Sequence, residues 1–247
     1  MWTPNPKFLP QQAPPPPYLV QQTKGGAVSA INWRMVTLVT ILVAGTNLLT
    51  FMASHQETSE ALIQEVKNES LYLIEKAANH IRDVDGFESK VREVANDLDI
   101  PPEWLMAVMY MESKFDPSIQ NLRGSGATGL IQFMVPAVKD LNARLGTKYY
   151  MSDIRRMSAE DQLHLVQEYL QTVRERHGEY RSLTDLYLGI LYPKAMNQEY
   201  CYALFAHGTR SYKLNRGLDE NKDGVVTNSD IDRRMKRMFP VAYKAQK

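Results

Sequence analysis

Residues 110–134 read YMESKFDPSIQNLRGSGATGLIQFM, and this stretch joins a helix end, a glycine-rich turn and an apolar run with one amide. Upstream of it, Pro101 and Pro102 can begin a helix, because the first turn does not need their missing N–H groups. One helical face then follows at i, i+3, i+4 and i+7, formed by Leu105, Val108, Met109 and Glu112. Glu112 is therefore expected on the face that packs into the core.

A carboxyl group in that position has two interpretations. Loss of hydration favours its neutral form and raises its pKa, which suits a general acid near neutral pH. A buried Glu can also pair with a Lys or Arg for purely structural reasons. The helix by itself leaves both interpretations open.

The glycines Gly124, Gly126 and Gly129 spell G-x-G-x-x-G. A dinucleotide-binding fingerprint requires a preceding buried strand and an acid about 20 residues later. The preceding residues PSIQNLR do not form such a strand, and the position twenty residues after Gly129 is Tyr149. The remaining interpretations are a surface turn, or a backbone-lined wall that a polymeric ligand can approach closely.

The pair Glu112-Ser113, followed by Gly126-Ala127-Thr128-Gly129-Leu130-Ile131-Gln132, resembles the catalytic segment of soluble lytic transglycosylases of the lysozyme superfamily. The resemblance implies cleavage of peptidoglycan glycan strands between N-acetylmuramic acid (MurNAc) and N-acetylglucosamine (GlcNAc). It also implies 1,6-anhydro-MurNAc ends and no cofactor for catalysis. Glu112 would act as acid and then as base, Ser113 would orient it or the substrate, and Gly129 and Gln132 would line the sugar groove.

A third motif of that family usually reads Ala-Tyr-Asn. The best alignment here is TDLYLGILYPKA, from Thr184 to Ala195, with Tyr192 at the Tyr position and Pro193 where Asn is usual. In this departure the chain resembles a phage-associated branch of the family. A Tyr could present its ring to a sugar and its hydroxyl to Glu112, or it could be a core aromatic. We assign Tyr192 to substrate binding on this alignment.

Between Asp116 and Asp140 the chain contains no acidic residue. Ordinary glycosidases use two carboxylates across the scissile bond. Asp116 precedes Pro117 and is expected to cap a turn, while Asp153 or Asp185 could still fold into the site. The local pattern favours a single acid over a paired-acid, lysozyme-type hydrolase.

Residues 219–230 read DENKDGVVTNSD, which is typical of a calcium loop. The expected ligands are Asp219, Asn221, Asp223, the Val225 carbonyl and Asp230, with Gly224 at the sharp turn. Thr227 and Asp230 also form a capping pattern for a following helix. The segment before the loop has poor helical periodicity, so we expect an exit helix without a full helix-loop-helix, and a structural Ca²⁺.

Residues 1–33 are proline-rich, which predicts a disordered tail that could bind a protein partner. Met35–Ala53 has 19 residues without a charge, enough to cross a thin lipid bilayer. Arg34 before it and Glu57 after it place the N terminus in the cytoplasm and the enzyme domain in the periplasm or outside, in a cell or virion membrane. A cleaved signal peptide is the alternative, but its leader would be unusually long.

The expected organisation is a tail at 1–33, a transmembrane anchor at 34–54, a helical stalk at 55–84 and a lytic transglycosylase domain at 85–247. The fold class is mainly α (α+β lysozyme-like), with an irregular or short-strand region near 122–133. Phe87, Val91, Val94 and Leu98 mark its first helix. Further helices are expected near 135–145, 158–176, 182–192 and 196–206.

Composition excludes several other classes of protein. The net charge of +1 argues against nucleic-acid binding, and the single cysteine, Cys201, excludes a disulfide framework and is expected in the core. Five histidines without paired spacing argue against a zinc peptidase, and Cys201 with His207 is a weak cysteine-hydrolase pair. Two competing functions remain: a peptidoglycan-binding module without catalysis and a structural membrane protein.

Overall fold

The computed structural model describes residues 50–52, 56, 70–122 and 125–245, and residues 67–247 form one compact unit. The predicted tail, nearly all of the predicted anchor and residues 55 and 57–69 of the predicted stalk lie outside the described residues. Within the described part of the chain, no helix is both long enough and apolar enough to cross a bilayer.

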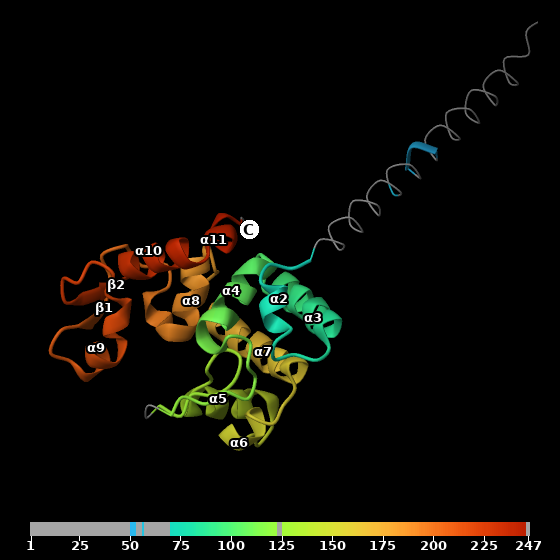
Figure 1. Cartoon of the computed structure of the whole chain (residues 1–247), viewed down its shortest axis with the longest axis horizontal. Helices are drawn as coiled ribbons and strands as arrows, with labels where there is room; N and C mark the ends of the chain where they lie inside the picture. The colour runs from blue at the N-terminus through green and yellow to red at the C-terminus, as the bar shows by residue number, and fades with distance from the viewer. Residues whose placement is uncertain (1–49, 53–55, 57–69, 123–124, 246–247) are drawn as a thin grey trace, which may run out of the picture. The chain divides into compact units, whose positions relative to one another are not determined.

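The fold is mainly helical, as predicted (Figure 1). Its helices and strands, in chain order, are α2 (Ile74–Ala77), α3 (Val84–Asp97), α4 (Pro102–Ser113), α5 (Val135–Leu145), α6 (Met151–Ile154), α7 (Ala159–His177), α8 (Leu183–Leu191), η1 (Pro193–Ala195), β1 (Ala203–Ala206), α9 (Arg210–Asn215), η2 (Arg216–Leu218), β2 (Val225–Thr227), α10 (Asn228–Met238) and α11 (Pro240–Lys244).

Helix α4 lies at the centre of the core, between α3 and α8 (Figure 1). All residues from Trp104 to Met109 are buried, so the middle of α4 is covered on every side. Helix α7 packs across α3 and also contacts α8 and α5. The predicted helices near 135–145, 158–176 and 182–192 are confirmed as α5, α7 and α8.

The globular core begins earlier than the boundary expected at residue 85. Leu71, Ala77 and Ile81 are buried members of the main core, and α2 is a single short turn that contacts α3. The prediction of a stalk up to residue 84 is therefore wrong for residues 71–84. These apolar residues find partners on the folded domain instead of on a second helix.

The helix expected near 196–206 is wrong, because Ala203–Ala206 form strand β1. This strand pairs antiparallel with β2 in the register Ala203↔Thr227, Phe205↔Val226 and Ala206↔Val225, with an irregularity between Ala203 and Phe205. Cys201 is exposed and not in the core. This segment is a strand because it pairs with β2, about 20 residues later in the chain, and local periodicity does not reveal so distant a partner.

The C-terminal helices complete the core around α4 and α8. The indole N–H of Trp104 on α4 donates to the carbonyl oxygens of Ala242 (2.9 Å) and Ala245 (3.2 Å). Helix α10 confirms the predicted exit helix after the loop. The short helices α9 and η2 precede that loop, so the expectation of no entry helix is corrected: a six-residue helix is present there.

Candidate active site

Helix α4 ends abruptly at Ser113 and carries Glu112 in its last turn. The next two residues, Lys114 and Phe115, have positive φ angles of 56° and 67°. Each costs about 1 kcal/mol for a residue other than glycine. Phe115 is fully buried, and its ring meets Phe87 edge-on at 6.2 Å, which offsets this cost. The turn thus reverses the chain directly after Glu112.

The reversal brings Lys114 back over the last turn of α4. Its Nζ lies 4.0 Å from the centroid of the Tyr110 ring, a cation–π contact. The charge of Lys114 acts on Glu112. Lys114 therefore places a positive charge near the Glu112 carboxyl group. Among the described residues, no ion pair holds this carboxyl group in its ionised form.

The Glu112 side chain is half-buried, and its carboxyl group is largely desolvated. Desolvation raises the pKa of Glu112 to about 7, while the charge of Lys114 and a hydrogen bond from the Tyr187 hydroxyl both act to lower it. Near neutral pH such a group can give up a proton and take one back. This is the electrostatic setting predicted for a general acid.

Tyr187 from α8 is the residue in contact with Glu112 that sequence reasoning missed. It is only 4 % exposed, and its hydroxyl donates to the Glu112 carboxylate. Burial raises the pKa of Tyr187 far above its ordinary value, and the charge of Glu112 raises it further, so the phenol stays a donor. Tyr187 lies five residues before Tyr192, the tyrosine chosen from the sequence.

Tyr192 lies elsewhere in the fold. It follows α8, and its ring packs edge-on against Phe205 of β1 with centroids 5.9 Å apart. Tyr192 is half-buried, so contact with a sugar through its exposed part stays a prediction. The Glu112 contact expected of it is made by Tyr187.

The glycine-rich segment folds into a tight loop beside α4. Thr128 and Phe133 exchange two backbone hydrogen bonds of 3.0 and 2.8 Å, and the Gly129 N–H donates to the Ile119 carbonyl (3.0 Å). Thr128 also forms an isolated bridge with Gln120. These bridges confirm the short-strand character predicted near 122–133, for the residues of that range that the structure describes.

The side chain of Gln162 of α7 holds this loop in place, and sequence reasoning also missed this residue. Its side chain is fully buried, and its Oε1 accepts from the Leu130 N–H at 2.8 Å. Its Nε2 donates to the carbonyl oxygens of Pro117 (2.7 Å) and Ile154 (2.8 Å). Three segments of backbone therefore meet on one amide. The only hint in the sequence is a polar residue among apolar neighbours on α7.

Gly129 lies directly against that amide, with φ +81°. A Cβ atom at this position would collide with the Gln162 side chain, so glycine is required both by conformation and by space. Gln132 has φ 53°, is half-buried, and its Nε2 donates to the Gly129 carbonyl at 3.2 Å. The two predicted groove residues are therefore in contact, and their role in sugar binding stays a prediction.

Ser113 ties α4 to the same loop. Its hydroxyl is 1 % exposed and lies 3.0 Å from the Met109 carbonyl and 2.9 Å from the Leu130 carbonyl. A buried hydroxyl that is shared between two carbonyl groups is not available to bind a sugar. The prediction that Ser113 contacts substrate is therefore corrected to a tie between the Glu112 helix and the Leu130 loop.

The other candidate acids are engaged elsewhere. Asp116 accepts from the Ser118 N–H at 2.8 Å, which confirms the predicted turn cap. Asp153 accepts from the Tyr150 N–H at the start of α6 and pairs with Arg156, and the Asp185 carboxylate accepts from the hydroxyl of Ser182, the N-cap residue of α8. Within residues 70–122 and 125–245, the groups that act on the Glu112 carboxyl are Lys114 and Tyr187, with no second carboxylate among them.

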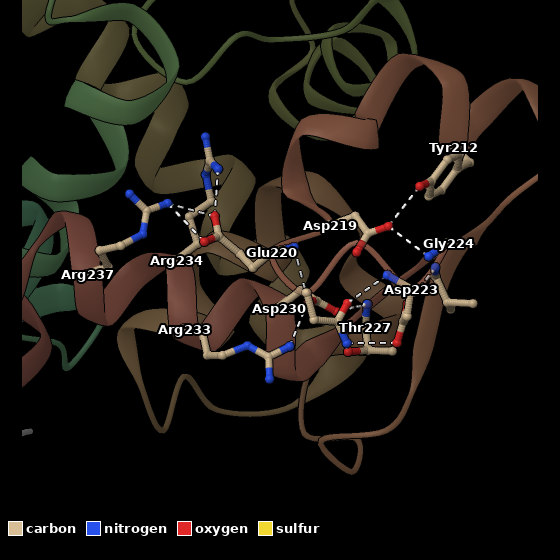
Figure 2. Close-up of polar contacts among 12 residues, drawn as sticks. Tyr212, Asp219, Glu220, Asp223, Gly224, Thr227, Asp230, Arg233, Arg234 and Arg237 are labelled. Carbon is tan, nitrogen blue, oxygen red and sulfur yellow. Dashed lines mark hydrogen bonds and ion pairs between the residues drawn. The ribbon is translucent and has the colours of Figure 1, made fainter.

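The 219–230 loop is folded by its own acids (Figure 2). Asp219 Oδ2 accepts from the Tyr212 hydroxyl (2.7 Å) and the Gly224 N–H (3.0 Å). Its Oδ1 is buried and has no hydrogen-bond partner. The Asn221 amide donates to Asp223 Oδ2 at 2.7 Å. No group of three or more His, Cys, Asp or Glu side chains suited to a metal occurs among the described residues.

Asp230 is fully buried and completes the capping box of α10, whose N-cap residue is Thr227. Its Oδ2 accepts from the N–H and hydroxyl of Thr227 (2.9 and 2.6 Å), which confirms the predicted capping pattern. Its Oδ1 accepts from the Glu220 N–H (3.2 Å) and pairs with Arg233 (2.8 Å). Both oxygens are therefore occupied, and Asp230 does not fit the calcium-ligand role in this arrangement.

Residues 89–203 match the family model described as the transglycosylase SLT domain. No curated protein matches the chain. The matched segment contains Glu112, the glycine-rich loop, Gln162 and Tyr187, which are the parts of the site described above. Residues 89–203 are therefore similar to the transglycosylase SLT domain, whose family members are peptidoglycan lytic transglycosylases, which are lyases.

Proposed function

We propose that the chain cleaves the MurNAc-GlcNAc bond of peptidoglycan with Glu112 as its only acid–base residue and leaves 1,6-anhydro-MurNAc ends. The observation that carries this proposal is the isolated carboxyl group of Glu112. Desolvation raises its pKa to about 7, and no other carboxylate of the described residues acts on it. The SLT domain supports peptidoglycan as the substrate.

In the first step, neutral Glu112 gives its proton to the glycosidic oxygen as the C1–O bond breaks. The GlcNAc part leaves with that proton as a free hydroxyl. Positive charge develops at C1 of MurNAc, and the acetamido group of the same sugar can stabilise it. The hydrogen bond from Tyr187 and the charge of Lys114 stabilise the carboxylate that Glu112 becomes.

In the second step, the Glu112 carboxylate takes the proton of the C6 hydroxyl of MurNAc as that oxygen attacks C1. The new C6–O–C1 bond closes the anhydro ring, and Glu112 is neutral again. No water is consumed. A group with a pKa near 7 suits both proton transfers, because neither protonation state is strongly favoured.

The products of digestion in H₂¹⁸O test this mechanism. We expect anhydro-MurNAc ends without ¹⁸O, measured by mass spectrometry of the released muropeptides. Reducing MurNAc ends that carry ¹⁸O would instead show a lysozyme-type hydrolase. Binding to peptidoglycan without any release of fragments would show a non-catalytic binding module.

We propose that the 219–230 loop binds a structural Ca²⁺ through Asp219, Asn221, Asp223 and the Val225 carbonyl. The buried Asp219 Oδ1 without a partner supports this, because a desolvated carboxylate oxygen needs a hydrogen-bond donor or a cation. Asp230 could join only after release from Arg233. Because Asp230 pairs with Arg233 and does not bind the metal, we expect weak affinity for Ca²⁺, with Kd of about 10⁻⁴ to 10⁻³ M.

Calorimetry with the variants Asp219→Ala, Asp223→Ala and Arg233→Ala tests the calcium site. We expect the two Asp variants to lose Ca²⁺ binding. Arg233→Ala should tighten binding by about tenfold, because it frees Asp230 to act as a ligand. Unchanged Ca²⁺ binding in Asp219→Ala would contradict the ligand assignment.

We propose that Met35–Ala53 is a retained single-pass anchor in the lipid bilayer that places the SLT domain outside the cytoplasm, in a phage-associated role such as genome entry or lysis. The charge-free length of the segment supports an anchor, and the peptidoglycan substrate supports an extracytoplasmic location. Alkaline carbonate extraction of the full chain and of a variant lacking residues 1–54 tests the anchor. Release of the full chain into the soluble fraction would contradict it.

A further inference from the structure

A cavity of about 270 Å³ lies between helices α5 and α7, which pack against each other (Figure 1). One side of its lining begins at Met134, two residues after Gln132 of the glycine-rich loop. The lining also includes Pro193, which follows the end of the helix that carries Tyr187. The chain that leaves each side of the candidate active site therefore runs directly into the wall of this cavity.

Tyr169 of α7 connects the cavity wall to both of these segments. Its ring meets Phe133 edge-on with centroids 6.3 Å apart, and Phe133 is the neighbour of Gln132. Its hydroxyl donates to the carbonyl of Gly189 at 3.2 Å, and Gly189 lies two residues after Tyr187 on α8. One side chain of the cavity wall is thus packed against the loop and the helix that form the site.

The interior of the cavity is apolar. Helix α5 contributes Ala137 and Leu141, and α7 contributes Tyr169 and Val173, each pair one helical turn apart. Leu141 and Val173 are buried, and Ala137 is half-buried. A wall of this kind suits small aliphatic groups better than a sugar ring, whose hydroxyl groups would lose their hydrogen bonds to water there.

The rim of the cavity carries one charge of each sign. Arg176 of α7 donates to Asp140 of α5 at 3.3 Å, and both side chains are 61 % exposed. The neighbouring Arg144, by contrast, is held by two hydrogen bonds to Glu175 (2.8 and 2.9 Å) and one to Glu168 (3.0 Å). A single exposed ion pair contributes little to stability, so Arg176 and Asp140 can exchange their contact for a charged ligand at small cost.

We propose that this cavity binds the peptide stem that MurNAc carries in peptidoglycan, and that the chain prefers strands with peptides to bare glycan. A stem contains alanine methyl groups, free carboxylates and a diamino acid with an ammonium group. The methyl groups match the apolar interior, a carboxylate matches Arg176, and the ammonium group matches Asp140. The inference rests on the proposed function, because it names the part of peptidoglycan that the chain engages beside Glu112.

A pair of substrates tests this preference: strands with intact peptides, and the same strands after an amidase has removed the peptides. For the full chain in detergent micelles we expect kcat/KM to be about tenfold higher on the intact strands, because binding energy from a remote part of the substrate adds to transition-state stabilisation. Mass spectrometry of the released anhydro-MurNAc ends measures both rates. Equal kcat/KM values on the two substrates would overturn the proposal.

Two variants assign the preference to the cavity. Ala137→Phe fills the interior and should bring the ratio of the two kcat/KM values close to one. Arg176→Ala changes only the exposed rim and should lower that ratio about threefold. Arg156→Ala is the matched control, because it also removes an exposed arginine that pairs with one aspartate, and it should leave the ratio unchanged. A ratio that is the same in all three variants would contradict the assignment.

Saturation-transfer-difference NMR with the free stem tetrapeptide gives a readout that does not depend on catalysis. We expect saturation of its alanine methyl groups by the full chain and by Glu112→Gln, and loss of that signal in Ala137→Phe. Peptide binding together with full activity of Glu112→Gln would refute the proposed function and leave this inference standing. Cleavage without any saturation of the peptide would do the reverse. An equal loss of kcat/KM on both substrates in Ala137→Phe would identify a sugar site and also overturn the inference.

Discussion

Glu112→Gln is expected to lower the rate of peptidoglycan cleavage by about 10²- to 10⁴-fold while the domain stays folded. The amide keeps the size of the side chain and can still accept a hydrogen bond from Tyr187, but it cannot supply or remove a proton. No other carboxylate of the described residues acts at this position, so none is placed to take over. Turbidity loss of purified peptidoglycan measures the rate, and undiminished cleavage would contradict the assignment.

The pH dependence of the unmodified chain follows from the same group. Glu112 must be neutral to donate its proton, so we expect kcat/KM to fall as pH rises through about 7. Tyr187→Phe removes a hydrogen bond that lowers the pKa of Glu112, so the fall of kcat/KM should move to higher pH. An unchanged pH dependence of kcat/KM in Tyr187→Phe would show that Tyr187 does not lower the pKa of Glu112.

The raised pKa also predicts a stability change that controls for misfolding. The neutral form of Glu112 is favoured in the folded state, so its contribution to stability is present below its ordinary pKa of 4.5 and is lost as pH rises through about 7. Glu112→Gln removes the titratable group, and with it the loss of stability at high pH. Its melting temperature should therefore exceed that of the unmodified chain at pH 8 and approach it at pH 4.

Gln162→Leu is expected to destabilise the domain by about 3 kcal/mol, because it leaves three buried backbone groups without partners. These groups are the Leu130 N–H and the carbonyls of Pro117 and Ile154. For a domain of this size, that loss lowers the melting temperature by roughly 6–12 °C. Thermal unfolding followed by circular dichroism measures it, and peptidoglycan cleavage should fall because the glycine-rich loop loses its anchor.

Gln167→Leu is the matched control on the same helix. Gln167 makes one solvent-exposed hydrogen bond to Asp97, so its replacement should change stability by about 0.5 kcal/mol or less. Equal melting temperatures for the two variants would show that the Gln162 amide does not hold the loop. Gly129→Ala should resemble Gln162→Leu, because its new Cβ would displace the same amide.

Several elements could be predicted because their causes are local. The apolar period of 3.6 residues located α3, α5, α7 and α8, and the Thr227–Asp230 pattern located the start of α10. The motif spacing predicted Glu112 as the candidate acid beside a glycine-rich loop. A capping pattern or an apolar stripe acts within one or two helical turns, so the residues that cause it are neighbours in the sequence.

The partners of Glu112 could not be predicted in this way. Tyr187 and Gln162 lie on other helices, and their side chains matter only because α8 and α7 pack against α4 and its loop. The strand at Ala203–Ala206 likewise depends on a distant partner, β2. An alignment by motif alone chose Tyr192, which is five residues too late for the Glu112 contact.

The sequence by itself predicted Glu112 as the acid, the loop beside it and the chemistry that the family resemblance implies, because the motif lies within one short stretch of the chain. Tertiary structure alone decided what surrounds Glu112. Tyr187 donates to its carboxylate, Gln162 holds the glycine-rich loop, and the C-terminal helices α10 and α11 pack against α8 and α4. Desolvation and electrostatic potential depend on which segments meet in space. The pKa of Glu112 is therefore a property of the fold.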